Sequence, residues 1–126
     1  MEKIWDRSQV LLMPSLWCEA WGLVVVEAQI RGIPVISSDA GAIPEAKLNI
    51  PYIIPVRKLT GLDDNKGYTI PPQDIDPWVD ALRLLMTDRT EYERLSDMSR
   101  DITSNWVLNL DPSIHEQWLM GSENCN

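Results

Sequence analysis

The chain has 126 residues, with 11 Lys and Arg against 19 Asp and Glu, so its formal net charge is −8 at pH 7. This length is enough for one domain with a hydrophobic core. The acidic balance argues against nucleic acid or an anionic membrane surface as a partner, because both attract clusters of positive side chains. An anionic ligand would therefore need local backbone dipoles or cations supplied from elsewhere.

Two cysteines, Cys18 and Cys125, lie near opposite ends of the chain, without the spacing of a metal or redox site. They could form one disulfide, but we favour two reduced thiols in a cytoplasmic protein. The sequence shows no transmembrane segment, and its first residues lack the apolar core of a signal peptide. We therefore expect a cytoplasmic location.

The first expected elements are a helix end and a strand. Residues 2–8 resemble the end of a helix. The apolar run Val10–Met13, ended by Pro14, predicts a strand buried on both faces. A loop over residues 14–21 follows.

The segment Leu23–Arg31 is ambiguous, because its three consecutive valines favour a strand. Gly32 and Pro34, however, are typical of a helix end followed by a new strand, at residues 35–37. We therefore predict a helix over Leu23–Arg31. Since it is apolar nearly all round, it should be buried on most sides.

The second half begins with a strand at residues 52–54, a surface turn at residues 63–67 and a short strand at residues 68–70. A helix over residues 76–86 follows, capped by Asp76 with Pro77 in its first turn. Strands that alternate with helices predict an α/β domain with a parallel sheet.

Two more helices are expected near the end of the chain. The Thr90–Glu93 capping box opens the first, and Asp111 opens a short last one. The apolar stripe of the first should contain Tyr92, Leu95, Met98 (or Ser99) and Ile102.

Candidate site residues follow two of the expected strands. In open parallel sheets ligands gather at the carboxyl ends of the strands. The first strand leads into the loop with Ser15 and Glu19, and the second leads into residues 39–45, so both loops should lie at one edge. Glu27 lies about 7.5 Å beyond Gly22 along the helix axis. A glycine turn at a helix start, with acids on either side, can bind a sugar joined to a diphosphate.

Simpler interpretations remain open for these residues. Acids near a helix start are common, because they suit its positive end. Glu27 stands among valines and an alanine, where burying a carboxylate without a partner is costly, and this favours a functional role. Trp17 and Trp21 could stack on a base or sugar ring, although packing of the loop is the simpler reading. Cys18 is a poor nucleophile candidate, since the single histidine, His115, lies in the last expected helix.

Taken together, these segments resemble the C-terminal, donor-binding domain of retaining glycosyltransferases with the GT-B fold, and within them glycosyltransferase family four, the group 1 enzymes. The resemblance is strong over residues 9–47 and looser beyond them. It rests on Pro14-Ser15, Glu19, Gly22, Glu27-Ala28, Gly32-Ile33-Pro34-Val35-Ile36 and Gly41-Ala42-Ile43-Pro44-Glu45. Ala42 departs from the pattern, because the family often has a second glycine there.

The resemblance implies a Rossmann-like parallel sheet flanked by helices, as the truncated second half of such a domain. Residues 1–120 would be this partial domain and residues 121–126 a disordered tail. The family's acceptor-binding N-terminal domain, and earlier strands with Arg and Lys for the diphosphate, are not in the sequence. The fragment should therefore be inactive alone. The open edge of the Val10–Met13 strand should pair with a second copy, or with a chain that supplies the missing half.

By the same resemblance, the substrate is a UDP-, GDP- or ADP-sugar for hexosyl transfer, without a metal or other cofactor. Glu19 would bind the sugar hydroxyls beside the N–H groups of Ala20, Trp21 and Gly22. The N–H groups of Leu23 and Val24 would face the diphosphate, and Glu27 would accept from the ribose. Ser15 and Gly41 are secondary candidates. The rivals are a non-catalytic interaction module with the same fold and, less favoured, a sugar-nucleotide epimerase.

Overall fold

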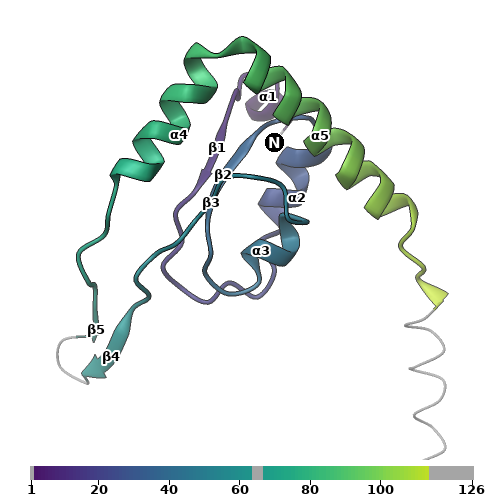
Figure 1. The fold of residues 1–126 in the computed structure, drawn as a ribbon. Helices are drawn as coiled ribbons and strands as arrows, with labels where there is room; N and C mark the ends of the chain where they lie inside the picture. The colour runs from purple at the N-terminus through teal and green to yellow at the C-terminus, as the bar shows by residue number, and fades with distance from the viewer. Residues whose placement is uncertain (1, 64–66, 114–126) are drawn as a thin grey trace, which may run out of the picture.

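We describe the protein from a computed structural model, which covers residues 2–63 and 67–113 (Figure 1). Three parallel strands form the central sheet, in the order β1 (Leu11–Met13), β2 (Val35–Ser38) and β3 (Ile53–Ile54). Leu11 is in register with Val35, and Ser37 with Ile53. The α/β class and the parallel sheet predicted from the sequence are confirmed.

Helices cover both faces of this sheet (Figure 1). A short helix, α1 (Glu2–Trp5), precedes β1, and α2 (Leu23–Ile30) connects β1 to β2. The core on the α2 side contains Trp5, Val25, Ala28, Ile33, Val35 and Ile43. The core on the opposite side, under α4 (Asp76–Thr87) and the start of α5 (Arg89–Leu108), contains Ile36, Ile50, Ile54, Ala81, Leu85 and Leu95. The sheet therefore lies between two apolar layers, and β2 is buried along its whole length.

The helix predicted over Leu23–Arg31 is confirmed, but its burial is only partial. Val25, Ala28 and Gln29 are buried, whereas Leu23 is 67% exposed and Glu27 is also exposed. Residues four apart share one face of a helix, so Leu23 and Glu27 mark the side of α2 that faces solvent. The expectation of a helix buried on most sides is wrong, and so is the burial of the Glu27 carboxylate that it implied.

Strand β1 also departs from its prediction. Leu11 and Met13 pack toward α2, but Leu12, on the other face, is 45% exposed. The cause is the position of the strand, because β1 pairs only with β2 and forms one edge of the sheet described here. Burial on both faces is therefore wrong for this strand, whereas its open edge agrees with the expectation.

Two elements were not predicted. The helix α3 (Ile43–Ala46) lies within a segment read as a loop, and the strand β4 (Thr60–Asp63) pairs with β5 (Gly67–Thr69) as a separate antiparallel hairpin. Figure 1 shows this hairpin projecting away from the central sheet.

The helix starts differ from their predicted caps. Asp76 is the first residue of α4 rather than its cap; Ile75 precedes it, and the Asp74 carboxylate accepts from the Asp76 N–H at 3.1 Å. In α5 the cap is Asp88, which accepts from the Glu91 N–H at 3.0 Å, and not Thr90.

Helix α5 runs antiparallel along α2. Gly32 accepts a hydrogen bond from the Ser96 hydroxyl at 2.6 Å, and Trp21 stacks on Trp106 with ring centroids 5.9 Å apart. The buried residues of α5 are Leu95, Ser99 and Thr103, a ridge with a spacing of four, in which Leu95 belongs to the core under α4 and Thr103 accepts from the Gln29 side-chain amide of α2 at 3.2 Å. Ile102, predicted in the stripe, is 38% exposed because that ridge takes its place.

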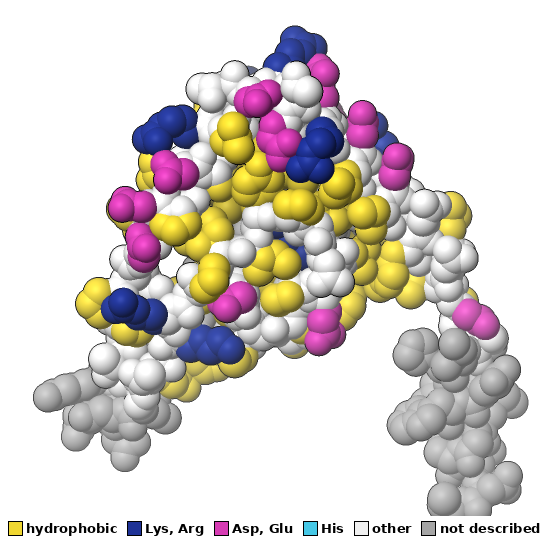
Figure 2. All heavy atoms as spheres, viewed as in Figure 1, with side chains coloured by type: hydrophobic (Ala, Val, Ile, Leu, Met, Phe, Trp, Pro, Cys, Tyr) yellow, Lys and Arg dark blue, Asp and Glu magenta, His cyan; other side chains and the backbone are white. Residues whose placement is uncertain are grey.

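Figure 2 shows charged side chains on the outer side of α4 and α5, and hydrophobic ones between these helices and the sheet. No helix among residues 2–63 and 67–113 combines the length and hydrophobicity that crossing a bilayer requires. The last expected helix falls outside the described residues apart from residues 111–113, and the tail falls outside them entirely.

Candidate functional site

The two loops that follow β1 and β2 meet at the carboxyl edge of the sheet. The Ala42 N–H donates to the Glu19 carbonyl oxygen at 2.9 Å. Gly41 packs directly on the same segment, since a Cβ at this position would overlap the backbone N and O of Glu19 and lie 2.8 Å from the Cys18 carbonyl carbon. Its φ of 59° also favours glycine. The structure therefore brings Glu19 and Gly41 together, as the strand order predicts.

The Glu19 side chain is half-buried beside Ser15. The Ser15 hydroxyl lies 3.1 Å from Glu19 Oε1 and donates a hydrogen bond to it. This contact fixes one carboxylate oxygen and leaves the other available to accept from a ligand hydroxyl. Ser15, a secondary candidate from the sequence, thus contacts the principal one.

The start of α2 follows directly. Gly22 stands at the N-cap with φ 76° and ψ 55°, and no side chain caps the helix. The Val25 N–H is used internally, donating to the Gly22 carbonyl at 2.9 Å. The described residues provide no hydrogen-bond acceptor for the N–H groups of Leu23 and Val24. These two donors, at the positive end of a helix, are suited to an anion.

The two aromatic candidates differ in environment. Trp21 is half-buried, packs against the α2-side core and stacks on Trp106 of α5. Trp17 is 52% exposed and makes an edge-to-face contact with Tyr68 of the β4–β5 hairpin, with centroids 5.1 Å apart. Packing in the core therefore accounts for the presence of Trp21. Ala20, the candidate residue beside it, is exposed.

Glu27 lies one turn beyond the helix start, on the same solvent-exposed side as Leu23. Its carbonyl oxygen accepts from Arg31 Nη1 at 2.8 Å, and no hydrogen bond of its carboxylate is seen within the described ranges. The Glu27 carboxylate is therefore accessible to solvent, whereas its apolar neighbours in the sequence suggested a buried one.

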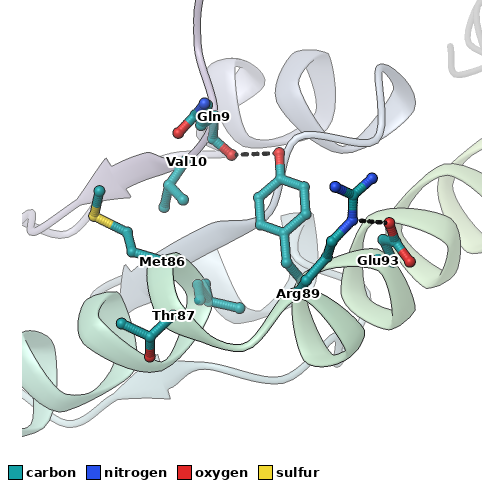
Figure 3. Close-up of a pocket in the computed structure, with 8 residues that line it drawn as sticks. Gln9, Val10, Met86, Thr87, Arg89 and Glu93 are labelled. Atoms are coloured by element: carbon teal, nitrogen blue, oxygen red, sulfur yellow. Dashed lines mark hydrogen bonds and ion pairs between the residues drawn. The ribbon is translucent and has the colours of Figure 1, made fainter.

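Two cavities of the described part of the chain lie away from Glu19 and Glu27. One of about 390 Å³ opens between the start of β1 and the α4–α5 junction, where the Tyr92 hydroxyl donates to the Gln9 carbonyl at 2.9 Å and Arg89 pairs with Glu93 at 2.7 Å (Figure 3). It is at the amino end of the sheet, opposite the Glu19 loop. An apolar cavity of about 210 Å³ lies on the other side of the carboxyl edge, lined by Pro14, Leu16, Val56 and Trp78 among others. Neither Glu19 nor Glu27 lines these two cavities.

Two residues near this edge support the structure through hydrogen bonds, and no sequence pattern predicted a role for either. Asp39, which follows β2, accepts from the Val56 N–H at 3.0 Å and joins the ends of β2 and β3. Lys47, which follows α3, is fully buried and donates from Nζ to the carbonyl oxygens of Pro51 and Tyr52. Burial lowers the pKa of Lys47 to about 7. A lone lysine after a short helix normally indicates a surface position, so nothing in the sequence indicated that Lys47 is buried.

Among residues 2–63 and 67–113 no group of three His, Cys, Asp or Glu side chains is placed to hold a metal ion. Cys18 is a free, exposed thiol. His115 lies outside the described residues.

Comparison with known proteins gives the family. The model of the glycosyl transferases group 1 matches residues 1–102. The chain is 31% identical to the sulfoquinovosyl transferase of Arabidopsis thaliana over 106 residues, which is 84% of this chain and 18% of that protein. It is also 31% identical to the MMP alpha-(1->4)-mannosyltransferase of Mycolicibacterium hassiacum, over 74% of this chain and 19% of that protein.

A third relative is the lipopolysaccharide core biosynthesis mannosyltransferase of Rhizobium meliloti, 31% identical over 68% of this chain and 21% of that protein. The chain thus spans about a fifth of the length of these relatives. The family match covers most of the chain, and the α/β sheet with its two flanking layers agrees with the C-terminal domain of a GT-B protein. The chain belongs to the group 1 glycosyl transferases.

Proposed function

We propose that this chain is the donor-binding part of a retaining glycosyltransferase of family four, and that it recognises a nucleotide-diphosphate sugar. The observation that carries the proposal is the junction of the two loops. There the Ala42 N–H holds the Glu19 backbone at 2.9 Å, beside a helix start whose first two N–H groups have no acceptor among the described residues. A carboxylate that can accept from hydroxyl groups thus lies close in sequence to two N–H groups that can donate to an anion, and this supports the proposal.

In this proposal each candidate residue has a distinct task. The free oxygen of Glu19 accepts from hydroxyls of the transferred hexose, next to the backbone of Ala20 to Gly22. The N–H groups of Leu23 and Val24 bind the diphosphate, whose charge the helix start helps to neutralise as it leaves. Glu27, exposed one turn later, accepts from the ribose hydroxyls. A carboxylate suits a diol because both of its oxygens accept hydrogen bonds.

The donor could carry uracil, guanine or adenine. The names of the relatives include a sulfoquinovosyl transferase and two mannosyltransferases, so the family match does not select one sugar. We propose that the 126 residues bind donor but do not transfer the hexose by themselves. A cytoplasmic location, favoured by the two cysteines, stays a prediction.

Isothermal titration calorimetry with UDP-glucose, GDP-mannose and ADP-glucose tests the proposal. Hydrogen bonds to a charged group contribute about 1.5–3 kcal/mol each, so Glu19→Gln and Glu27→Gln should each weaken binding by about 10- to 100-fold. Glu93→Gln is the control, because Glu93 lies at the opposite end of the sheet. A folded protein that binds none of the three donors, or an equal loss in the control, would contradict the proposal.

The second candidate function is a non-catalytic interaction module. It is favoured by the edge of β1, which has no neighbouring strand among residues 2–63 and 67–113, and by the exposed Leu12 beside it, since an open edge can pair with a strand of another chain. We propose that this edge pairs with a second copy or with a separate chain. A monodisperse monomer in light scattering at high concentration would count against self-pairing, and loss of a dimer in Leu12→Lys would support it.

A further inference from the structure

Lys47 is a buried lysine without an acidic partner among the described residues. Its exposed fraction is zero, and it is among the largest fully buried side chains of the protein. Nζ donates to the carbonyl oxygen of Pro51 and, at 2.9 Å, to that of Tyr52. Burying an amine is costly unless its N–H groups find acceptors, so the two carbonyls account for its tolerance at this position. The lysine can hold both carbonyls even when it is uncharged, because a neutral amine retains two N–H donors.

The loop that Lys47 holds is conformationally unfavourable. It connects α3 to β3, and Leu48, Asn49 and Tyr52 within it have φ values of 54°, 59° and 71°. Left-handed backbone is costly for residues with a side chain, above all for a bulky one, and persists only where other contacts maintain it. The hydrogen bonds from Lys47 are such contacts, since they join both ends of this loop.

The backbone hydrogen bonds of α3 connect Lys47 to the candidate site. The Lys47 N–H donates to the Ile43 carbonyl at 2.9 Å, and the Ala46 N–H donates to the Ala42 carbonyl at 3.0 Å, so α3 joins Lys47 to Ala42. Ala42 in turn holds Glu19.

The far end of the loop is hydrogen-bonded to strand β2 of the sheet, and this completes a hydrogen-bonded circuit around Lys47. The Tyr52 carbonyl that accepts from Lys47 also accepts from the Ser37 N–H of β2 at 3.0 Å. Strand β2 leads directly into Asp39 and Gly41, the second half of the candidate site. Both ends of the segment between β2 and α3 are therefore tied to Lys47, the β2 end through its amine and the α3 end through its backbone.

We infer that Lys47 is a positioning residue for the donor site, which holds the Asp39–Ala42 segment at the spacing that places Glu19 beside the start of α2. This inference rests on the proposed function. Lys47 does not touch the donor, and acts through α3 on one side and through β2 on the other.

The test compares Lys47→Met, which keeps the length and removes the donors, with Lys47→Gln, which keeps an N–H₂ donor group. Leu85→Ala is the matched control, because Leu85 is a buried residue of α4 and belongs to no part of the hydrogen-bonded circuit. Amide hydrogen exchange of Ser37 and Ala42 and the affinity for UDP-glucose, GDP-mannose and ADP-glucose are measured on each folded variant.

We expect Lys47→Met to lower protection at Ala42 by at least 10-fold relative to Leu85→Ala and to weaken donor binding by a similar factor. Lys47→Gln should restore part of both. Equal Ala42 protection in Lys47→Met and Leu85→Ala would overturn the inference, and so would a Lys47→Gln variant no better than Lys47→Met. If the Lys47 variants do not fold, exchange in the unmodified protein decides: Ser37, Ala42 and Lys47 should open together across a denaturant series, and independent opening would overturn the inference.

The exchange measurement also separates the two proposals. If the unmodified protein binds no donor, but the Ala42 amide loses protection in Lys47→Met, the proposed function is refuted and the structural link between Lys47 and Ala42 is retained. Normal donor binding in Lys47→Met would leave the proposed function standing and refute the role of Lys47.

Discussion

Replacing Gly41 with alanine tests how the two loops of the candidate site are joined. The new methyl group would overlap the Glu19 backbone and lie 2.8 Å from the Cys18 carbonyl carbon. The residue would also keep a φ of 59°, in the left-handed region. Left-handed backbone costs about 1–2 kcal/mol for a residue with a side chain, and overpacking adds about 1–3 kcal/mol. We therefore expect a total loss of about 2–5 kcal/mol.

Gly61→Ala provides the matched control. Gly61 has a φ of 61°, close to that of Gly41, but no atom lies within 4 Å of the position that its Cβ would occupy. The backbone cost is thus shared, and the difference between the two variants isolates the overlap with Glu19. Urea denaturation should show Gly41→Ala to be less stable than Gly61→Ala by about 1–3 kcal/mol. Equal losses, with an unchanged Ala42 amide signal in Gly41→Ala, would refute the close contact between the loops.

Three further predictions concern stability and titration. Burial lowers the pKa of Lys47 to about 7, against 10.5 for a lysine in water, so the unfolded chain binds one more proton than the folded protein between these pH values. The free energy of unfolding should therefore rise with pH from about 7 to about 10.5. Denaturant titrations at several pH values should show this rise in the wild type and not in Lys47→Met. At about 1.36 kcal/mol per pKa unit, the rise is at most about 5 kcal/mol. Asp88→Ala should cost about 1 kcal/mol because it removes the cap of α5, whereas Thr90→Ala should stay within about 0.5 kcal/mol; the reverse order in urea melts would place the cap at Thr90. Burial and a 2.7 Å hydrogen bond to Glu91 raise the pKa of Tyr52 to about 12, so ultraviolet titration should find one tyrosine ionising near there in the wild type and at lower pH in Glu91→Gln.

The sequence was sufficient for the elements whose patterns are local. The apolar run before Pro14 and the Gly32-Ile33-Pro34 sequence mark β1, the end of α2 and the start of β2, and parallel pairing then brings the Glu19 and Gly41 loops to one edge. These features were predictable because short-range chemistry and the rules of parallel sheets determine them.

Other features depend on contacts that the sequence pattern does not show. Glu27 was expected among buried neighbours, but α2 has one face against the sheet and α5 and another in solvent, so exposure follows from packing and not from composition. The short helix α3 contains Pro44 in its first turn and only four residues, too few for a periodic signal. Lys47 is buried because two carbonyls of a loop in left-handed conformation converge on it, and no residue type in the sequence marks that geometry.

The most direct test of the central claim is a residue-resolved NMR titration of the whole chain with UDP-glucose, GDP-mannose and ADP-glucose. We expect one of these donors to shift the amide signals of residues 19–27, above all those of Leu23 and Val24, and to leave the signals around Gln9 and Arg89 unchanged. A well-dispersed spectrum in which residues 19–27 respond to none of the donors would contradict the assignment of this corner as a nucleotide-sugar site.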